Sequence, residues 1–458
     1  MQRQRMRPEN SKKNFSFNPV RERSPALFIM ALLAGLIGGA FAGMYAWVES
    51  WLTEFRIILA SSGETSEVVL VFGAGLLAGF GFWLVFRFAP VAGGSGIPEV
   101  EGALEDIRPA PWKRVLPVKF IAGICTMASG MILGREGPSV QMGAYSGKMI
   151  ADLFRLSNNS SHILLATGAA AGLAAAFNAP LAGILFVIEE MRLQFRYGFT
   201  SVKAVFIGTI AGALVVQMWM DQSPALSMPV FHEQPLQSLW LYLGLGTLFG
   251  FLGIFFNKVL LVVLDGYAKL VAGSVYRFVI LGCLLGMLAA GLSITTPELT
   301  GGGLEVINDV VQTPLSLFTL FSLFILRFAL TMVFYGSGAP GGIFAPMLAL
   351  GTLAGLFFGY IANALVPELV TSPGVFAIAG MGALFAATVR APLTGTVLVL
   401  EMTDNYSLIL PMIITCLGAT LVAQWLGGRP IYSQLLERTL RIKAEKERSE
   451  AVNPVLGI

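Results

Sequence analysis

The sequence has few charged side chains and no strong excess of either sign. Charged residues make up 12% of the 458 positions, about half of the roughly 25% found in average soluble domains. Lys and Arg number 30 against 27 Asp and Glu, which leaves a net charge of +3. Such a chain offers no basic field for a nucleic acid and is too apolar for a water-soluble enzyme.

Cysteine and histidine are also scarce. Cys125, Cys283 and Cys416 each lie in an apolar run, far from one another, which is typical of small buried side chains rather than of bridges or ligands. His162 and His232 have no second His or Cys at metal-ligand spacing, so we expect no metal site and no cofactor. An enzyme within the membrane would need a nucleophile with a base, or a metal cluster, and no Ser/His or His/Asp spacing indicates one.

Long apolar runs dominate the sequence instead, since 55% of its residues are hydrophobic. A helix of about 20 apolar residues spans the hydrocarbon core of a membrane. The runs that are long enough are 26–48, 68–89, 115–133, 203–220, 238–264, 273–292, 314–335 and 407–427. We therefore expect an all-α polytopic membrane protein.

Gly and Pro interrupt the chain between these runs and leave further apolar segments, several of them well short of 20 residues. These segments are 95–106, 137–155, 161–177, 180–191, 343–363, 374–388 and 391–402. They suggest half-spanning helices, because a broken helix at membrane depth is tolerated where its free backbone groups are buried in protein or line a polar cavity. Ordinary Gly and Pro enrichment of membrane helices is the alternative.

Basic residues cluster at both ends of the chain. The first 24 residues hold seven Lys or Arg, and six more follow Gly428. By the positive-inside rule we expect both termini in the cytoplasm, which requires an even number of crossings. No small-residue cleavage site follows the basic start, so we expect no cleaved signal peptide. The tail has helical spacing from Tyr432 to Ala444 and is too short for a regulatory domain.

The sequence repeats itself at nearly the same offset, which is 206 to 212 residues for the three matching pairs. The matching pairs are GSGIPEV (94–100) with GGGLEV (301–306), GREGP (134–138) with GIFAP (342–346), and APLAGILFVIEEM (179–191) with APLTGTVLVLEM (391–402). Three pairs in the same order indicate a duplicated half. The expected division is a basic cytoplasmic segment 1–25, a first half 26–220, a connecting loop 221–237, a second half 238–427, and a cytoplasmic helix and tail 428–458. An odd number of crossings per half would make the repeat inverted, which the residues alone leave open.

The motifs GREGP and GIFAP predict an anion site. Each places Gly and Pro at the start of an apolar segment, where the backbone N–H groups form the partially positive end of a helix. With few basic side chains nearby, an anion is held mainly by N–H and hydroxyl donors, weakly enough to leave again. Ser95 and Tyr432 can supply hydroxyls, although a turn-former and an interface aromatic are their ordinary roles.

Glu136 lies inside GREGP and is itself an anion that can occupy such a site. Deprotonated, it would fill the position that the helix ends favour, and protonated, it would release it. Anion and proton would then compete at one place. The alternative is an ion pair at the membrane interface between Arg135 and Glu136.

Glu189 and Glu190 end a short apolar segment, where either could admit protons from the cytoplasm or simply form a solvated cap. The repeat separates them, because Glu189 matches Glu401 whereas Glu190 faces Met402. The matched residue favours a structural role and the unmatched one a functional role. Glu190 is therefore the better candidate for proton transfer.

Lys119 and Arg327 are cations inside apolar runs at equivalent repeat positions. Glu101 is close to Lys119 in sequence. Because buried charges are usually paired, we expect an ion pair between Glu101 and Lys119 rather than chemistry at either residue.

Four segments resemble the CLC family of chloride channels and proton-coupled chloride transporters, most of all its bacterial exchangers of the ClcA type. They are GSGIPEVEG (94–102), GREGPSVQMG (134–143), GGIFAPMLALG (341–351) and Tyr432 within RPIYSQLL. The likeness runs from about residue 26 to 440. It implies two inverted-topology halves of tilted, unequal and broken helices. It also implies a homodimer with one anion pathway per subunit in the bacterial inner membrane.

The same resemblance assigns roles to residues. It implies that Ser95, Tyr432 and the amides of Ile343 and Phe344 coordinate chloride, and that Glu136 is the external gate and proton site. Gly134, Arg135 and Gly137 belong to the same motif and are supporting candidates. Glu189, Glu101 and Lys119, outside the motif, are supporting candidates as well. The resemblance makes Glu190 the internal proton-transfer residue, which favours exchange of chloride for protons. A passive voltage- or pH-gated chloride channel is the alternative.

Overall fold

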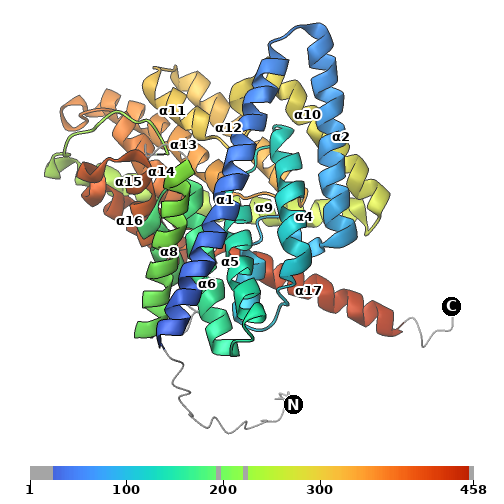
Figure 1. Cartoon of the computed structure of the whole chain (residues 1–458). Helices are drawn as coiled ribbons and strands as arrows, with labels where there is room; N and C mark the ends of the chain where they lie inside the picture. Colours follow the sequence, from blue (N-terminus) through green and yellow to red (C-terminus); the bar gives the residue numbers. More distant parts are fainter. Residues whose placement is uncertain (1–23, 192–197, 220–224, 453–458) are drawn as a thin grey trace, which may run out of the picture.

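Helices are the named secondary-structure elements of the residues that the computed structural model describes, 24–191, 198–219 and 225–452 (Figure 1). The helices are α1 (Ser24–Ala60), α2 (Glu64–Phe88), α3 (Ile97–Leu104), α4 (Trp112–Ala128), α5 (Glu136–Leu153), α6 (Asn158–Phe177), α7 (Pro180–Glu189), α8 (Phe199–Trp219), α9 (Leu239–Val271), α10 (Val275–Thr295), α11 (Leu304–Gln312), α12 (Leu317–Gly336), α13 (Phe344–Leu365), α14 (Gly374–Val389), α15 (Pro392–Thr403), α16 (Ile409–Trp425) and α17 (Ile431–Val452). Lengths range from 8 to 37 residues. The expected all-α fold of unequal helices is confirmed.

Proline and glycine set the starts of the shortest helices. Pro98, Pro180 and Pro392 lie in the first turns of α3, α7 and α15, where a missing N–H removes no helical hydrogen bond. Gly96 and Gly303, the residues before α3 and α11, have φ angles of 86° and 105°. Glycine adopts this left-handed conformation without strain. Local residues therefore produce the predicted breaks.

Nine helices in the described ranges are long and apolar enough to cross a membrane. Seven of these helices form from the eight long apolar runs predicted from the sequence. The remaining run forms α4, which has 17 residues and contains Pro117. The other two, α6 and α13, come from the interrupted segments. They are full-length helices rather than half-spanning ones, and 94% and 72% of their most apolar windows are buried inside protein. Only α3, α7, α14 and α15 of that set are too short to cross alone.

The helices α1–α8 and α9–α16 form two halves with the same pattern of contacts. α5 packs on α6 and α1 on α8, just as α13 packs on α14 and α9 on α16. The halves meet through equivalent helices, α2 with α10 and α7 with α15. Loops of the two halves also form equivalent backbone hydrogen bonds with each other. Gly94 N donates to Gly338 O at 3.2 Å, and Gly301 N donates to Gly130 O at 3.0 Å. This approximate two-fold exchange is the arrangement of an inverted repeat.

Glycine allows the helices at the centre of each half to approach closely. A Cβ on Gly143 of α5 would lie 2.2 Å from the carbonyl oxygen of Gly168 in α6. A Cβ on Gly351 of α13 would lie 2.4 Å from the carbonyl oxygen of Gly380 in α14. Both pairs occupy equivalent positions of the repeat. Small residues at crossings let membrane helices pack backbone to backbone, and here they bring the starts of α5 and α13 to the centre of the molecule.

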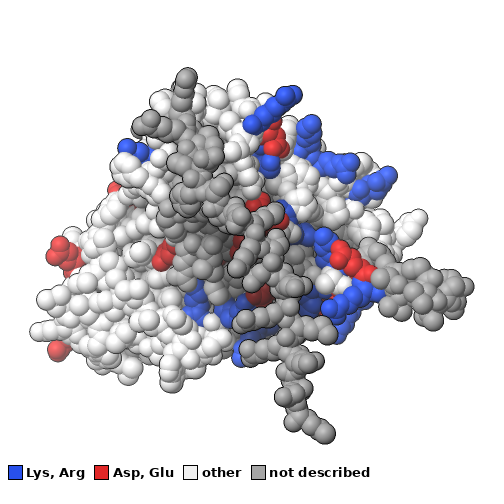
Figure 2. Space-filling model, turned by 90° about the horizontal axis from the view of Figure 1, so that it is seen from below, with Lys and Arg blue, Asp and Glu red and all other residues white. Residues whose placement is uncertain are grey.

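α1 begins and α17 lies on the same side of the molecule (Figure 1). Figure 2 views that side and shows Lys and Arg side chains gathered on it. Large apolar side chains, such as those of Phe72, Leu76 and Val262, are exposed elsewhere on the molecule, as expected of a surface that contacts lipid. The protein is therefore a multi-pass membrane protein whose basic residues are concentrated toward one side.

Candidate functional site

The starts of α5 and α13 face each other through a short antiparallel bridge. Gly134 N donates to Gly342 O at 2.8 Å, and Gly342 N donates to Gly134 O at 2.6 Å. Arg135 and Ile343, the residues that precede the two helices, form no capping bond with their side chains. Because the first N–H groups of a helix have no partner within it, two partially positive helix ends converge on one place.

Glu136 extends its side chain into this place and is fully buried. A Cβ built on Gly134 would lie 2.0 Å from Oε2 of Glu136 and 3.2 Å from the amide nitrogen of Ala345, in the first turn of α13. The carboxylate of one half therefore lies beside the helix start of the other half. Within the described chain neither carboxylate oxygen has a hydrogen-bond partner of good geometry. The Glu136 carboxyl group thus faces two helix starts and forms no ion pair within the described residues.

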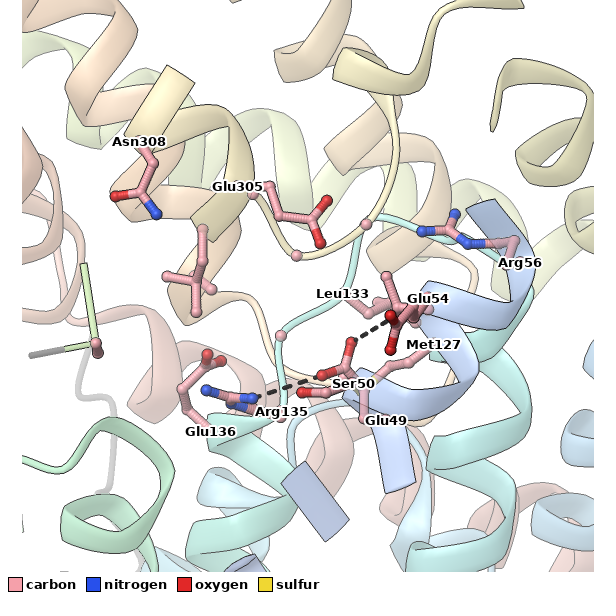
Figure 3. Close-up of a pocket in the computed structure, with 18 of the residues that line it drawn as sticks. Glu49, Ser50, Glu54, Arg56, Met127, Leu133, Arg135, Glu136, Glu305 and Asn308 are labelled. Atoms are coloured by element: carbon pink, nitrogen blue, oxygen red, sulfur yellow. Dashed lines mark hydrogen bonds and ion pairs between the residues drawn. The ribbon is translucent and has the colours of Figure 1, made fainter. Parts of the chain in front are cut away.

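Arg135 does not pair with Glu136, so the ion pair considered as an alternative from the sequence is wrong. Its Nη1 lies 3.6 Å from Oε2 of Glu49 on α1 (Figure 3). The physical reason is that Glu49 on α1 offers the guanidinium group a carboxylate partner, while the Glu136 carboxyl group lies beside the start of α13. Arg135 turns toward α1, whereas Glu136 turns toward α13.

Gly134 and Gly137 provide the space that this geometry requires. A Cβ on Gly137 would lie 2.8 Å from the carbonyl oxygen of Ser95 and 3.0 Å from its Oγ. Any side chain at these two positions would displace the Glu136 carboxylate or the Ser95 loop. The supporting role expected of both glycines is thus steric.

Ser95 and Tyr432 are buried side chains on the other side of the bridge. Ser95 Oγ accepts a bond from Ile97 N at 3.2 Å, which orients the hydroxyl at the start of α3. The Tyr432 hydroxyl, in the first turn of α17, is buried and has no protein partner within the described chain. Both residues are buried, and each hydroxyl group is chemically able to donate one hydrogen bond.

Ile343 and Phe344 form the start of α13 and are fully buried. The Phe344 ring packs against Phe177 at 5.3 Å and Phe385 at 4.2 Å between ring centroids. These contacts with α6 and α14 fix the backbone at this point. The amide groups of both residues lie at the helix end, where donors for an anion are expected.

Tyr335, at the end of α12, is a further hydroxyl that the sequence interpretation missed. It is buried, and its hydroxyl is in hydrogen-bonding contact with Ser95. Its position immediately before the GSGAPGGIFAP segment was the available signal. We place it beside the proposed chloride ligands because it restrains the Ser95 hydroxyl.

Two cavities approach the bridge from opposite sides. One, of about 410 Å³, is lined by Glu136 together with Glu49, Arg56 and Glu305 (Figure 3). The other, of about 370 Å³, is lined by Ser95 and Tyr335 and by residues of α17 such as Arg438. The first cavity opens near the C-terminal end of α1, and the second cavity opens on the side where α1 begins. The bridge thus separates two cavities, each with charged residues in its lining.

Glu190 and Glu101 lie together on the α17 side. Glu190 directly follows α7, and its side chain lies close enough to that of Glu101 on α3, which is 1% exposed, for the two carboxyl groups to influence each other. The ion pair predicted between Glu101 and Lys119 is wrong. Lys119 Nζ instead donates to the carbonyl oxygens of Ala92 at 3.0 Å and of Gly94. The loop before α3 has carbonyl groups that no helix satisfies, and the buried ammonium group satisfies them.

Arg327 plays the same part in the second half. Its Nη1 donates to the carbonyl oxygen of Glu298 at 2.6 Å, and its Nη2 to that of Gly301 at 2.9 Å. This loop precedes α11, the counterpart of α3. Both buried cations thus hold glycine-rich loops rather than carboxylates.

Glu189 and Glu401 cap each other's neighbouring helix across the two halves. The Glu189 carboxylate accepts from Leu393 N at 3.1 Å and Thr394 N at 2.7 Å, at the start of α15. The Glu401 carboxylate accepts from Leu181 N at 3.0 Å and Ala182 N at 2.8 Å, at the start of α7. A carboxylate stabilises the positive end of a helix. This arrangement accords with the structural role favoured for Glu189.

One His/Asp pair was not visible from sequence spacing. His162 Nε2 lies 3.0 Å from Asp106 Oδ1, and it joins the start of α6 to the loop after α3. No group of three or more His, Cys, Asp or Glu that could hold a metal ion occurs within 24–191, 198–219 and 225–452.

The profile of the voltage gated chloride channel family matches residues 74–424, and the chain belongs to this family of CLC proteins. The H(+)/Cl(-) exchange transporter ClcA of Vibrio parahaemolyticus is 53% identical over 90% of this chain and 89% of its own. ClcA of Yersinia pseudotuberculosis is 50% identical over 94% and 91%. Among solved structures, a slow cyanobacterial Cl-/H+ antiporter is 41% identical with a TM-score of 0.87, over 91% of this chain and 98% of that chain. A CLC-type fluoride/proton antiporter, 19% identical with a TM-score of 0.75, covers 89% and 97% and shares the fold.

Proposed function

We propose that the protein is a secondary active transporter that exchanges chloride for protons across the membrane. The observation that carries this proposal is the buried Glu136 carboxylate beside the converging starts of α5 and α13. An anionic side chain here occupies a position suited to an inorganic anion. The relatives named as proton/chloride exchangers support the same assignment.

The mechanism follows from competition at that position. Ionised Glu136 closes the pathway between the two cavities by filling the anion position. When Glu136 takes a proton from the cavity that it lines, it loses its attraction to the helix ends and withdraws. Chloride then enters the position that the carboxylate has left.

Chloride is held by neutral donors in this proposal. Ser95 and Tyr432 provide hydroxyls, and Ile343 and Phe344 provide amides. The absence of a direct cation contact keeps the site weak enough for release, as rapid ion movement requires. Ser95 and the α17 cavity give chloride access from the side where α17 lies.

Protons reach Glu136 from that same side through Glu190 in this proposal. Glu190 is at the end of α7, in contact with the buried Glu101. Two neighbouring carboxyl groups, of which Glu101 is buried and Glu190 half-buried, exchange a proton more readily than they hold two negative charges. Proton and chloride pathways are then separate on the α17 side and join at Glu136.

The remaining assignments follow from the family. We propose a homodimer with one pathway per subunit, located in the bacterial inner (plasma) membrane with both termini in the cytoplasm. The division into halves 26–220 and 238–427, with a connecting loop and a short cytoplasmic tail, belongs to the same proposal. Chloride and protons are the transported ions, and no cofactor takes part.

The reversal potential of the purified protein in a planar bilayer tests the proposal. A chloride gradient is imposed first, and a proton gradient is then added at fixed chloride. Exchange predicts a potential short of the chloride equilibrium value that moves with the proton gradient. A potential that stays at the chloride equilibrium value whatever the pH difference identifies a passive chloride channel instead.

A further inference from the structure

The cavity beside Glu136 contains an ion pair that the exchange mechanism does not use. Arg135 Nη1 lies 3.6 Å from Oε2 of Glu49, and these side chains are only 16% and 18% exposed. The other carboxylate oxygen of Glu49 accepts a bond from Thr53 Oγ1 at 3.2 Å, one turn further along α1. The Glu49 carboxylate is thus oriented by its own helix toward Arg135 (Figure 3).

This pair determines which way the Arg135 guanidinium points. Arg135 is adjacent in sequence to Glu136, and both line the same cavity. Without a partner on α1, the long arginine side chain could reach the neighbouring carboxylate. Arg56, the other arginine lining this cavity, is fixed by a 2.8 Å bond from its Nη1 to Ser293 Oγ on α10.

We propose that Glu49 is a positioning residue for the gate: by holding Arg135 against α1, it keeps a cation off the Glu136 carboxylate and leaves that carboxylate able to take up a proton from the cavity. An arginine that paired with Glu136 would stabilise its ionised form. The gate would then remain closed at pH values where it now opens. This inference rests on the gating role in the proposed function.

Other ionisable groups around the Glu136 carboxylate must be considered in any pH dependence. They come from α1, α11, α17 and the loop before α5: Tyr45, Glu49, Glu54, Arg56, Glu305, Tyr432 and Arg135. Among these, Glu49 is the residue in ion-pair contact with Arg135. Glu54 provides a matched control because it is also acidic, also on α1 and also lines the cavity, and it makes no ion pair within the described chain.

The test compares Glu49→Gln with Glu54→Gln in liposomes, with chloride flux measured against the pH on the side of this cavity. We expect Glu49→Gln to shift the half-maximal pH of chloride flux to the acid side by about half a unit or more, since the released arginine favours ionised Glu136. We expect Glu54→Gln to shift it by less than half as much. Equal shifts in both variants would overturn the proposal, because a general change in cavity charge would then explain them.

A second comparison isolates Arg135. In a double variant, Glu49→Gln with Arg135→Gln, the acid shift should disappear, because no guanidinium remains to approach Glu136. Persistence of the shift would also overturn the proposal. Glu49→Asp keeps the charge and replaces Glu49→Gln if that variant is not recovered. Its shorter side chain should shift the half-maximal pH of chloride flux in the same direction. A pH profile like that of the wild-type protein would count against the proposal.

A different measurement shows whether the proposed exchange function itself fails. The reversal potential of the wild-type protein reports exchange or passive conduction whatever Glu49 does. The pH profile of chloride flux remains measurable in either case, so the role of Glu49 is tested on its own.

Discussion

The two halves of the molecule share a backbone plan but differ in chemistry. α5 and α13 start at equivalent positions, where the first half has Glu136 and the second has Phe344. At the ends of α7 and α15, the first half has Glu190 where the second has Met402. The first half thus supplies both of the proposed proton-carrying carboxyl groups, and the second supplies an apolar start that packs against Phe177 and Phe385.

Residues that hold the fold are, in contrast, present in both halves. Lys119 and Arg327 each bind the carbonyl groups of a glycine-rich loop. Glu189 and Glu401 each cap a helix of the opposite half. The comparison teaches that symmetric positions carry structure, whereas the carboxyl groups of the proposed function occupy asymmetric positions. Each variant below tests one side of that division.

The largest effect is expected at Glu136. Replacing it by Ala removes the carboxylate that competes with chloride, so proton movement should stop while chloride still passes. The reversal potential should then equal the chloride equilibrium value in a planar bilayer. Continued proton coupling in Glu136→Ala would contradict the proposed gate.

Glu190 is expected to have the next largest effect. Glu190→Val removes the carboxyl group at the end of α7, and proton flux measured with a pH electrode in a liposome suspension should fall by about tenfold or more. Chloride flux should continue, because the chloride ligands are elsewhere. Met402→Leu is the control in the other half. An unchanged ratio of proton to chloride flux in Glu190→Val would show that protons take another path.

Removal of either buried cation should destabilise the fold. Lys119→Met and Arg327→Met each leave buried carbonyl groups without a donor, at a cost of about 2–4 kcal/mol. Thermal unfolding of the purified protein in detergent should show a lower midpoint for both variants. Lys258→Met, at an exposed position of α9, is the control and should change little. A loss confined to one of the two buried positions would break the symmetry inferred here.

The smallest effect is expected from the reciprocal caps. Glu189→Gln and Glu401→Gln each retain an amide oxygen but lose the charge, so each should lower stability by about 1 kcal/mol. The same thermal measurement should give similar losses, and the proton-to-chloride ratio should stay unchanged in both. A change of that ratio in Glu189→Gln alone would assign Glu189 to proton transfer instead of to structure.

Much of the fold was predictable from local sequence. Helix starts at GREGP and GIFAP follow from Gly and Pro, whose backbone preferences act over a few residues. The apolar runs predicted seven of the nine helices that can cross a membrane. The constant offsets of 208 and 212 identified equivalent residues, including the symmetric pair Lys119 and Arg327, before their contacts were known.

The sequence by itself thus determined the helices, the repeat and the types of residue at the candidate site. The tertiary structure alone decided their partners: Lys119 binds carbonyl groups rather than Glu101, and Arg135 turns to Glu49 rather than to Glu136. It also showed that α6 and α13 are full-length helices enclosed by protein. The reason is physical, because a buried charge is satisfied by whichever group the packing of distant segments brings within a few ångströms, and adjacency in sequence does not specify that group.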